Sequence, residues 1–102
     1  MSITIDKYGT TEVDIQGTIR HYNLEGQLHQ DKIDKFGYTL PAVEYVNVNG
    51  LIKIWCKNNK LHRDDCDPIT GMILPAVEHY NGNINGKNEW YINGVKYILI
   101  KI

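Results

Sequence analysis

The segment Leu-Pro-Ala-Val-Glu occurs twice in this chain of 102 residues, at 40–44 and again at 74–78. The two copies lie 34 positions apart, and periods of roughly 20 to 50 residues are typical of proteins built from repeated structural units. Pro41 and Pro75 have no backbone N–H to donate, so each is expected to begin a strand or to lie on a sheet edge. This repetition constrains the fold most, because consecutive units of one kind must pack against one another.

The residue types favour strands joined by tight turns. The chain has 14 Ile, 6 Val, 6 Thr and 7 Tyr, which suit a pleated surface, and 10 Asn and 9 Gly, which tolerate positive φ in turns. No stretch shows the apolar period of about 3.6 residues that marks a helix. The expected fold is all-β: an antiparallel meander of about two and a half hairpin repeats of about 34 residues.

A chain of this length is expected to form one domain, and the pattern divides it into an N-terminal cap (1–16), a repeat region (17–94) and a C-terminal capping strand (95–102). The loops 30–39 and 63–73 differ between the units, so specific binding is expected there. The net charge of −1 gives no bulk attraction to nucleic acid or to an anionic membrane. The first ten residues do not resemble a secretory signal, and no apolar segment has the roughly 20 residues of a membrane span, so an intracellular, soluble protein is expected.

Asn-Gly pairs mark the expected turns. Asn49-Gly50 and Asn93-Gly94 predict tight hairpins, because a type I′ turn requires positive φ at both central residues. For the reversal between them, Asn81-Gly82 and Asn85-Gly86 are equally suitable, and the sequence leaves this choice open. Each unit is expected to be a three-strand meander: an aromatic strand, a short strand carrying Leu-His, and, after a loop, the Pro-Ala-Val strand.

The aligned units place three aromatic residues at one position, Tyr22, Trp55 and Trp90, and a turn residue follows each by four positions, Gly26, Asn59 and Gly94. Equivalent placement favours a role in the core for these rings. The alternative is a nucleic-acid-binding sheet on which the rings stack bases, and such a platform normally comes with a basic groove. With the net charge of −1, a nucleic-acid partner is not expected.

These motifs resemble the short β-hairpin repeats, often grouped with MORN-type repeats, that giant DNA viruses of the Marseillevirus and Mimivirus type encode. The resemblance covers residues 17 to 97 and departs from the MORN pattern of His-Gly, since His29 is followed by Gln30 and His62 by Arg63. It implies a scaffolding or protein-contact module of a virion or of the host cytoplasm. The matching residues are Gly26, Leu28, His29, Pro41, Ala42, Val43, Asn49, Gly50 and Trp55, and then Leu61, His62, Arg63, Pro75, Ala76, Val77, Asn85, Gly86, Trp90, Tyr91 and Gly94.

His29 and His62 are the first candidates for chemistry. Both follow a leucine at the same repeat position, and a histidine in such a place usually holds a turn by hydrogen bonding. The alternative is a metal-binding module or hydrolase that uses both histidines and the acidic loop 64–67. Asp65 and Asp67 alternate as calcium ligands do, but the closing acid and the glycine turn of a calcium loop are missing.

Cys56 and Cys66 are expected to be reduced thiols, because a small secreted scaffold would usually carry more cysteine pairs. Together with His62 they have the spacing Cys-x5-His-x3-Cys, which matches no compact zinc motif. The only serine is Ser2, and the chain has neither a nucleophile motif nor a phosphate-binding loop. The sequence therefore predicts a protein that is not an enzyme, with no catalytic, metal-binding or cofactor-binding residues.

The C-terminal segment 95–102 carries the best signal for an interaction, because its residues are apolar on both faces of a strand. Ile98, Ile100 and Ile102 form the candidate self-association strand, since an exposed apolar edge pairs readily with another chain. A two-fold homodimer is the commonest closed form, and other viral or host proteins are the alternative partners. The opposite expectation is that the N-terminal segment 2–5 or a loop covers this strand within one molecule.

Overall fold

The structure is a computed structural model, and it describes residues 1–47, 50–81, 84–85 and 88–98. Within these residues the chain forms strands and turns but no helix, which confirms the expected all-β class. A search of the same residues for a helix long and apolar enough to cross a membrane found none. The strands are β1 (Ser2–Asp6), β2 (Gly9–Val13), β3 (Ile19–Tyr22), β4 (Val43–Asn47), β5 (Gly50–Ile54), β6 (Cys56–Lys57), β7 (Lys60–Leu61), β8 (Val77–Asn81), β9 (Ile84–Asn85), β10 (Trp90–Ile92) and β11 (Val95–Tyr97).

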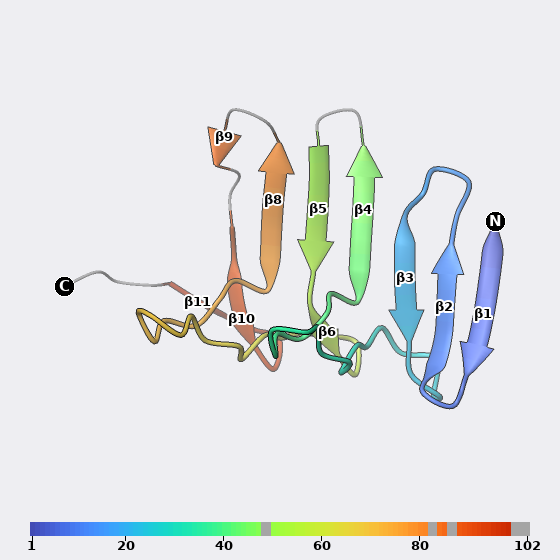
Figure 1. The fold of residues 1–102 in the computed structure, drawn as a ribbon, viewed down its shortest axis with the longest axis horizontal. Coiled ribbons are helices and arrows are strands. Elements are labelled where there is room, and N and C mark those ends of the chain that lie inside the picture. Colours follow the sequence, from blue (N-terminus) through green and yellow to red (C-terminus); the bar gives the residue numbers. More distant parts are fainter. Residues whose placement is uncertain (48–49, 82–83, 86–87, 99–102) are drawn as a thin grey trace.

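Seven strands form one antiparallel sheet in the order β1-β2-β3-β4-β5-β8-β9. Figure 1 shows this sheet with β1 at one edge and β9 at the other, and with the loops and short hairpins gathered at one end of its strands. The hairpins β6–β7 and β10–β11 are separate two-stranded sheets. The expected antiparallel meander is therefore confirmed, while the number of repeats stays a prediction.

The core of the described residues includes the two Pro-Ala-Val segments where they enter the sheet. Ala42 and Ala76 have no exposed surface, and each directly precedes a strand, β4 or β8. Protein interiors are close-packed, so a larger side chain at either position would have to displace its neighbours. The repeated motif is thus part of the core. The other buried apolar residues are Val43, Trp55, Cys56 and Val77.

Backbone hydrogen bonds recur at the interval that separates the two Leu-Pro-Ala-Val-Glu segments. The N–H of His21 donates to the carbonyl oxygen of Ala42 at 2.8 Å, and 34 positions later the N–H of Trp55 donates to that of Ala76 at 2.8 Å. His21 therefore corresponds to Trp55 in the fold. The prediction that Tyr22 occupies this place is wrong by one residue.

The cause of this shift is the length of the turn that follows. Tyr22 forms an isolated bridge with Leu28, whereas Cys56 pairs with Leu61. Five residues separate the first pair and four separate the second, so the first turn has one residue more. The shorter turn is centred on residues 58–59, two asparagines with φ of 51° and 67°, a region that asparagine enters more readily than most residues.

The Asn-Gly pairs form only some of the expected turns. Asn93-Gly94 joins β10 to β11 with φ of 50° and 80°, which confirms that hairpin. The prediction of Gly50 as a central turn residue is wrong, because Gly50 pairs with Asn47 and already begins β5, while Asn49 lies outside the described residues. Asn81 pairs with Ile84, so the chain reverses between these two residues, next to the first of the two candidate pairs.

The chain leaves the large sheet at Trp55, so the aromatic and Leu-His strands form short hairpins of their own and do not continue the meander. The N–H of Gln30 donates to the carbonyl oxygen of Cys56 at 3.1 Å, and the N–H of Arg63 donates to that of Tyr91 at 3.1 Å. Each hairpin therefore lies against the Leu-His segment that precedes it. We call this set the hairpin row: segment 22–30, β6–β7 with the two residues that follow, and β10–β11.

Three loops of the chain are closed by the same kind of hydrogen bond. Asp14, Asp34 and Asp67 each begin a loop, and in each case one carboxylate oxygen accepts two backbone N–H groups from the following residues at 2.8 to 3.1 Å. Such Asx turns are a known preference of aspartate in loops. The variable loops 30–39 and 63–73 therefore differ in sequence while being closed by the same kind of contact.

The N-terminal end of the hairpin row is closed. The turn between β1 and β2 lies so close to Tyr22 that a methyl group at Gly9 would overlap the Tyr22 carbonyl oxygen. Gly9 also has a φ of 136°, which residues with a side chain rarely adopt. Since β1 pairs with β2 at the edge of the large sheet, the expectation that residues 2–5 cover the C-terminal strand is wrong.

The C-terminal end of the row is different, because β11 pairs with β10 and with no other described strand. All three residues of β11 are exposed, and Ile98, the residue after it, is 83% exposed. Of the candidate self-association residues, Ile98 thus lies at the surface, while Ile100 and Ile102 lie outside the described residues. Figure 1 shows β1 and β11 on opposite sides of the molecule.

Candidate functional site

His29 and His62 make corresponding contacts in the hairpin row. Nδ1 of His29 accepts the N–H of Asn58 at 3.0 Å, and Nδ1 of His62 accepts the N–H of Asn93 at 2.9 Å. A neutral imidazole that accepts at Nδ1 carries its proton on Nε2, and this atom lies 3.3 Å or 3.5 Å from the carboxylate two positions further on. Nδ1 of each histidine therefore holds the turn of the next hairpin, while Nε2 faces a carboxylate of the histidine's own segment.

The carboxylates of the acidic loop 64–67 serve separate partners. Asp65 accepts the N–H and the hydroxyl of Thr39 and lies 2.9 Å from Nε of Arg63. Asp67 accepts N–H groups of its own loop, that of Thr70 above all, and these bonds lower its pKa. Over the described ranges, no group of three or more His, Cys, Asp or Glu side chains is placed to hold a metal ion.

The two cysteines are free thiols in different surroundings. Cys56 is buried, and burial raises the pKa of its thiol to about 11. The thiolate is the reactive form, so this group is a poor nucleophile near neutral pH. Cys66 is exposed, and its Sγ atom lies 3.7 Å from the carbonyl oxygen of Asp64.

Arg63 is the centre of a buried ionic cluster. Its guanidinium carbon lies 3.8 Å from the centre of the Trp55 ring, and its side chain is 6% exposed. Nε lies 2.9 Å from Asp65, Nη1 lies 3.3 Å from Glu78, and Nη1 donates to the carbonyl oxygen of Pro75 at 3.1 Å. A planar guanidinium suits such a place, because it stacks on an aromatic face while its edge binds carboxylates. We call Trp55, Arg63, Asp65 and Glu78 the Arg63 cluster.

At the N-terminal end, different residues take the corresponding places. Gln30 replaces the arginine, because its N–H makes the bond to the next hairpin that the N–H of Arg63 makes. The carbonyl oxygen of Lys32 accepts the N–H of Leu40, as that of Asp65 accepts the N–H of Leu74. Together with the equivalent glutamate of the first Leu-Pro-Ala-Val-Glu segment, they make up what we call the His21 cluster: His21, Gln30, Lys32 and Glu44.

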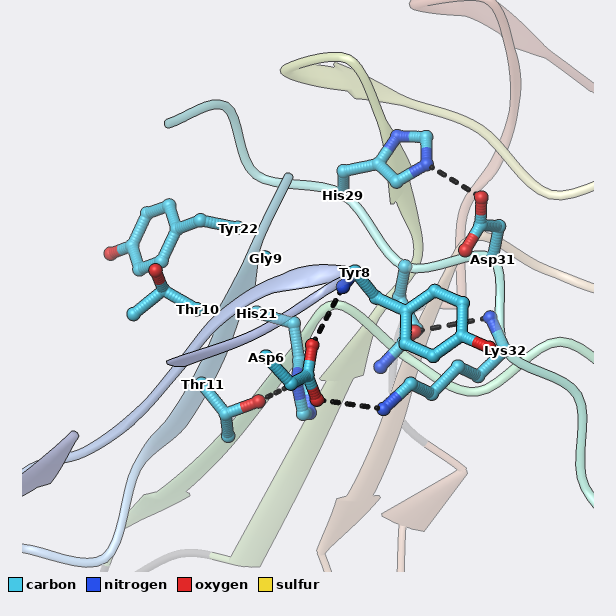
Figure 2. A pocket seen from close by; sticks show the side chains of 11 residues that line it. Asp6, Tyr8, Gly9, Thr10, Thr11, His21, Tyr22, His29, Asp31 and Lys32 are labelled. Carbon is cyan, nitrogen blue, oxygen red and sulfur yellow. Dashed lines mark hydrogen bonds and ion pairs between the residues drawn. The ribbon is translucent and has the colours of Figure 1, made fainter. Parts of the chain in front are cut away.

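A small polar pocket lies at the His21 cluster, where an imidazole replaces the larger indole. Figure 2 shows the side chains that line it, among them Asp6, Thr11, His21 and Lys32. Its volume is about 20 Å³, which is room for about one buried water molecule. The charged and polar groups converge on a space that admits little more than solvent.

Burial sets the electrostatics of this pocket. Nδ1 of His21 lies 2.8 Å from the hydroxyl of Thr11. Burial lowers the pKa of His21, Lys32 acts in the same direction, and Glu44 and Asp6 act against it. The carboxylate of Asp6 accepts the N–H of Tyr8 at 2.8 Å, and this bond, helped by Lys32 at 3.5 Å, lowers the pKa of Asp6.

The Thr11–His21 contact has the form of a nucleophile beside a base. Nucleophilic catalysis also requires an orienting group for the base, donors for an oxyanion and room for the substrate. A pocket of about 20 Å³ has no room for a substrate. The polar contacts of the cluster instead connect β1 and β2 to the residues on either side of segment 22–30, since they join Asp6 to Lys32 and Thr11 to His21.

The larger pocket lies at the C-terminal end of the hairpin row and has a volume of about 310 Å³. Its indole is held as the preceding one is, because Nε1 of Trp90 donates to the carbonyl oxygen of Ile73 at 2.9 Å and Nε1 of Trp55 donates to that of Thr39 at 2.7 Å. Counted from the turns 58–59 and 93–94, Ile98 stands where Arg63 stands. The pocket is therefore apolar and lined by Ile73, Trp90, Tyr91, Ile92, Tyr97 and Ile98.

Comparisons with protein-family models, with curated proteins and with solved structures found no match to this chain. The geometry alone therefore defines the candidate site: an apolar end of an all-β protein, opposite a closed polar end. Sequence reasoning points to the C-terminal end through Ile98 but misses the His21 cluster. The available signal is a histidine in the tryptophan position, which becomes visible once the extra residue of the first turn is counted.

Proposed function

We propose that this chain is a non-enzymatic protein-interaction module that associates with itself through its C-terminal end face, by which we mean Trp90, Tyr97, Ile98 and the outer edge of β11. The observation that carries the proposal is the apolar pocket of about 310 Å³ beside a strand whose residues are all exposed. Exposed apolar patches rimmed by polar residues mark interaction sites in soluble proteins. An exposed strand edge adds backbone groups that another chain can pair with.

The rest of the molecule supports the same proposal. The histidines at 29 and 62 and the carboxylates at 65 and 67 are bound to neighbouring groups of the chain itself. The polar pocket at His21 has room for about one water molecule. The resemblance to MORN-like hairpin repeats of giant DNA viruses agrees with a contact module, and it suggests a virion or the host cytoplasm as the place of action.

The test is the mass of the purified chain in solution, measured by light scattering over a range of concentrations. We expect a dimer that dissociates on dilution, and we expect Ile98→Lys to give a monomer because a charge would then enter an apolar contact. Ile15→Lys is the matched control, since Ile15 is 87% exposed in the turn between β2 and β3, near the β1 edge of the large sheet. A monomer at every concentration up to the high micromolar range would show the proposal to be wrong.

A further inference from the structure

We infer that two copies of this chain pair through the outer edges of their β11 strands, antiparallel and related by a two-fold axis, and that the N-terminal cap stops the assembly at two. The inference rests on the proposed function. It adds the strand that pairs, the direction of the pairing and the number of copies.

The pairing edge is identified by what covers the preceding hairpin. The carbonyl oxygen of Leu61 accepts the N–H of Gly94 at 2.8 Å, and the N–H of Arg63 donates to the carbonyl oxygen of Tyr91 at 3.1 Å. These bonds run from one strand to an antiparallel neighbour, the following hairpin. The corresponding groups at the C-terminal end are the carbonyl of Lys96 and the N–H of Ile98, and no described hairpin follows to cover them.

A second copy cannot meet this edge in the way that one hairpin meets the next within the chain. Inside the chain, the carbonyl oxygen of Cys56 accepts the N–H of Gln30. In head-to-tail stacking, the corresponding acceptor would be the carbonyl oxygen of Tyr22, and β11 of another copy would have to lie against it. That place is already occupied by the β1–β2 turn, because Gly9 lies in close contact with Tyr22. Among the described residues, no such element lies over the outer edge of β11, so two C-terminal ends can approach each other. A tail-to-tail pair is closed by its two-fold axis, whereas head-to-tail contacts form rings or open fibres.

Charge and side-chain size select the register. In an antiparallel pair, residues directly opposite alternate between hydrogen-bonded and non-hydrogen-bonded positions, and like charges opposite each other are destabilising. A register centred on Lys96 would oppose two ammonium groups. A register centred on Tyr97 instead places Lys96 opposite Ile98 of the second copy, where the outward-facing N–H and carbonyl groups can bond. It also brings the two apolar pockets to the same side of the interface.

Disulfide trapping tests this register. In a Cys66→Ser background, Tyr97→Cys should place a thiol directly opposite its own copy, at the Cβ separation of about 4.5–5.5 Å found for opposed residues, and mild oxidation should shift most of the protein to a linked dimer. Lys96→Cys is the control and should remain largely unlinked, because its own copy lies diagonally across the interface. Efficient linking at 96 and not at 97 would overturn the register.

Amide hydrogen exchange of the unmodified chain gives a second measurement that needs no substitution. The amides of Lys96 and Ile98 should exchange more slowly as concentration rises, while those of Val95 and Tyr97, which face β10, should change little. A dimer mass without these changes would overturn the pairing and leave the proposed function standing. A monomer would remove both. Masses that grow beyond two copies would show that the N-terminal cap does not stop assembly.

Discussion

Single positions in this chain tolerate only certain residue sizes, and they lie where two elements meet. Ala42 and Ala76 have no exposed surface at the entries of β4 and β8. Gly9 is in close contact with Tyr22 across the N-terminal cap. At each of these positions, adding or removing one methyl group decides whether the neighbouring element can stay in place.

Comparison of the variants Gly9→Ala and Gly37→Ala distinguishes the cost of backbone strain from the cost of steric overlap. Both glycines have positive φ, of 136° and 88°, so alanine is strained at either, by about 1–2 kcal/mol. At Gly37 an added methyl group would meet no atom within 4 Å, whereas at Gly9 it would overlap the carbonyl oxygen of Tyr22. We expect urea unfolding to show a larger loss for Gly9→Ala than for Gly37→Ala. Equal losses would contradict the close contact.

The His21 pocket should make stability depend on pH. Burial lowers the pKa of His21 in the folded chain below the ordinary value of 6.5, so the unfolded chain binds this proton more readily. The contribution of neutral His21 to the free energy of unfolding is fully present above pH 6.5. It is lost as the pH falls from 6.5 toward the pKa that His21 has in the folded chain. Unfolding free energies measured at pH values on both sides of 6.5 should fall less for His21→Asn, which does not titrate. A histidine NMR titration midpoint above 6.5 would contradict the sign.

The short hairpins are stabilised by contacts with neighbouring segments, because their own strands are too short to be stable alone. β6 and β7 have two residues each, and an isolated two-stranded hairpin is at best marginally stable in water. His29 and His62 reach from one hairpin to the turn of the next, at 3.0 Å and 2.9 Å. Each hairpin is therefore stabilised by the Leu-His segment that precedes it in the hairpin row.

The Arg63 cluster is a buried ionic connection between elements. Arg63→Met keeps much of the side-chain volume but leaves Asp65 and Glu78 close together without a cation, at side-chain exposures of 10% and 18%. Removing one partner of a buried ionic contact typically costs about 3–5 kcal/mol. Arg20→Met is the control, because Arg20 is 32% exposed and lies 3.1 Å from Asp14 at the surface, where such a pair contributes about 1 kcal/mol at most. Chemical denaturation should therefore show the larger loss at Arg63; similar losses would argue against a buried cluster.

Local residue patterns predict the elements better than they predict the partners of each element. The β-branched and aromatic residues give the all-β class, and Asn93-Gly94 gives the last hairpin, because these signals act within a few residues. The bend at Trp55 depends instead on a bond to Ala76, 21 positions away in the sequence. The His21 cluster also depends on residues that are distant in the sequence. The one-residue difference in turn length hides its correspondence to the Arg63 cluster when the two units are aligned by sequence.

At the scale of the whole molecule, the two ends of the hairpin row are built from corresponding positions with opposite character. The N-terminal end is filled by the β1–β2 turn and has a polar pocket of about 20 Å³. The C-terminal end carries an apolar pocket of about 310 Å³. The sequence predicts the exposed apolar end, since the residues after Gly94 are largely apolar, but not the closed end. That closure depends on Gly9 meeting Tyr22, a contact that no local pattern marks.

The two-strand step of the large sheet has a geometric consequence. β4 with β5, and β8 with β9, are added 34 positions apart, and neighbouring strands lie about 4.8 Å apart. Each such segment therefore widens the sheet by about 10 Å. Because the cap touches the first segment and the open face belongs to the last, extra segments could be inserted between them without altering either end. The number of such segments would thus set the distance between the N-terminal cap and the C-terminal end face.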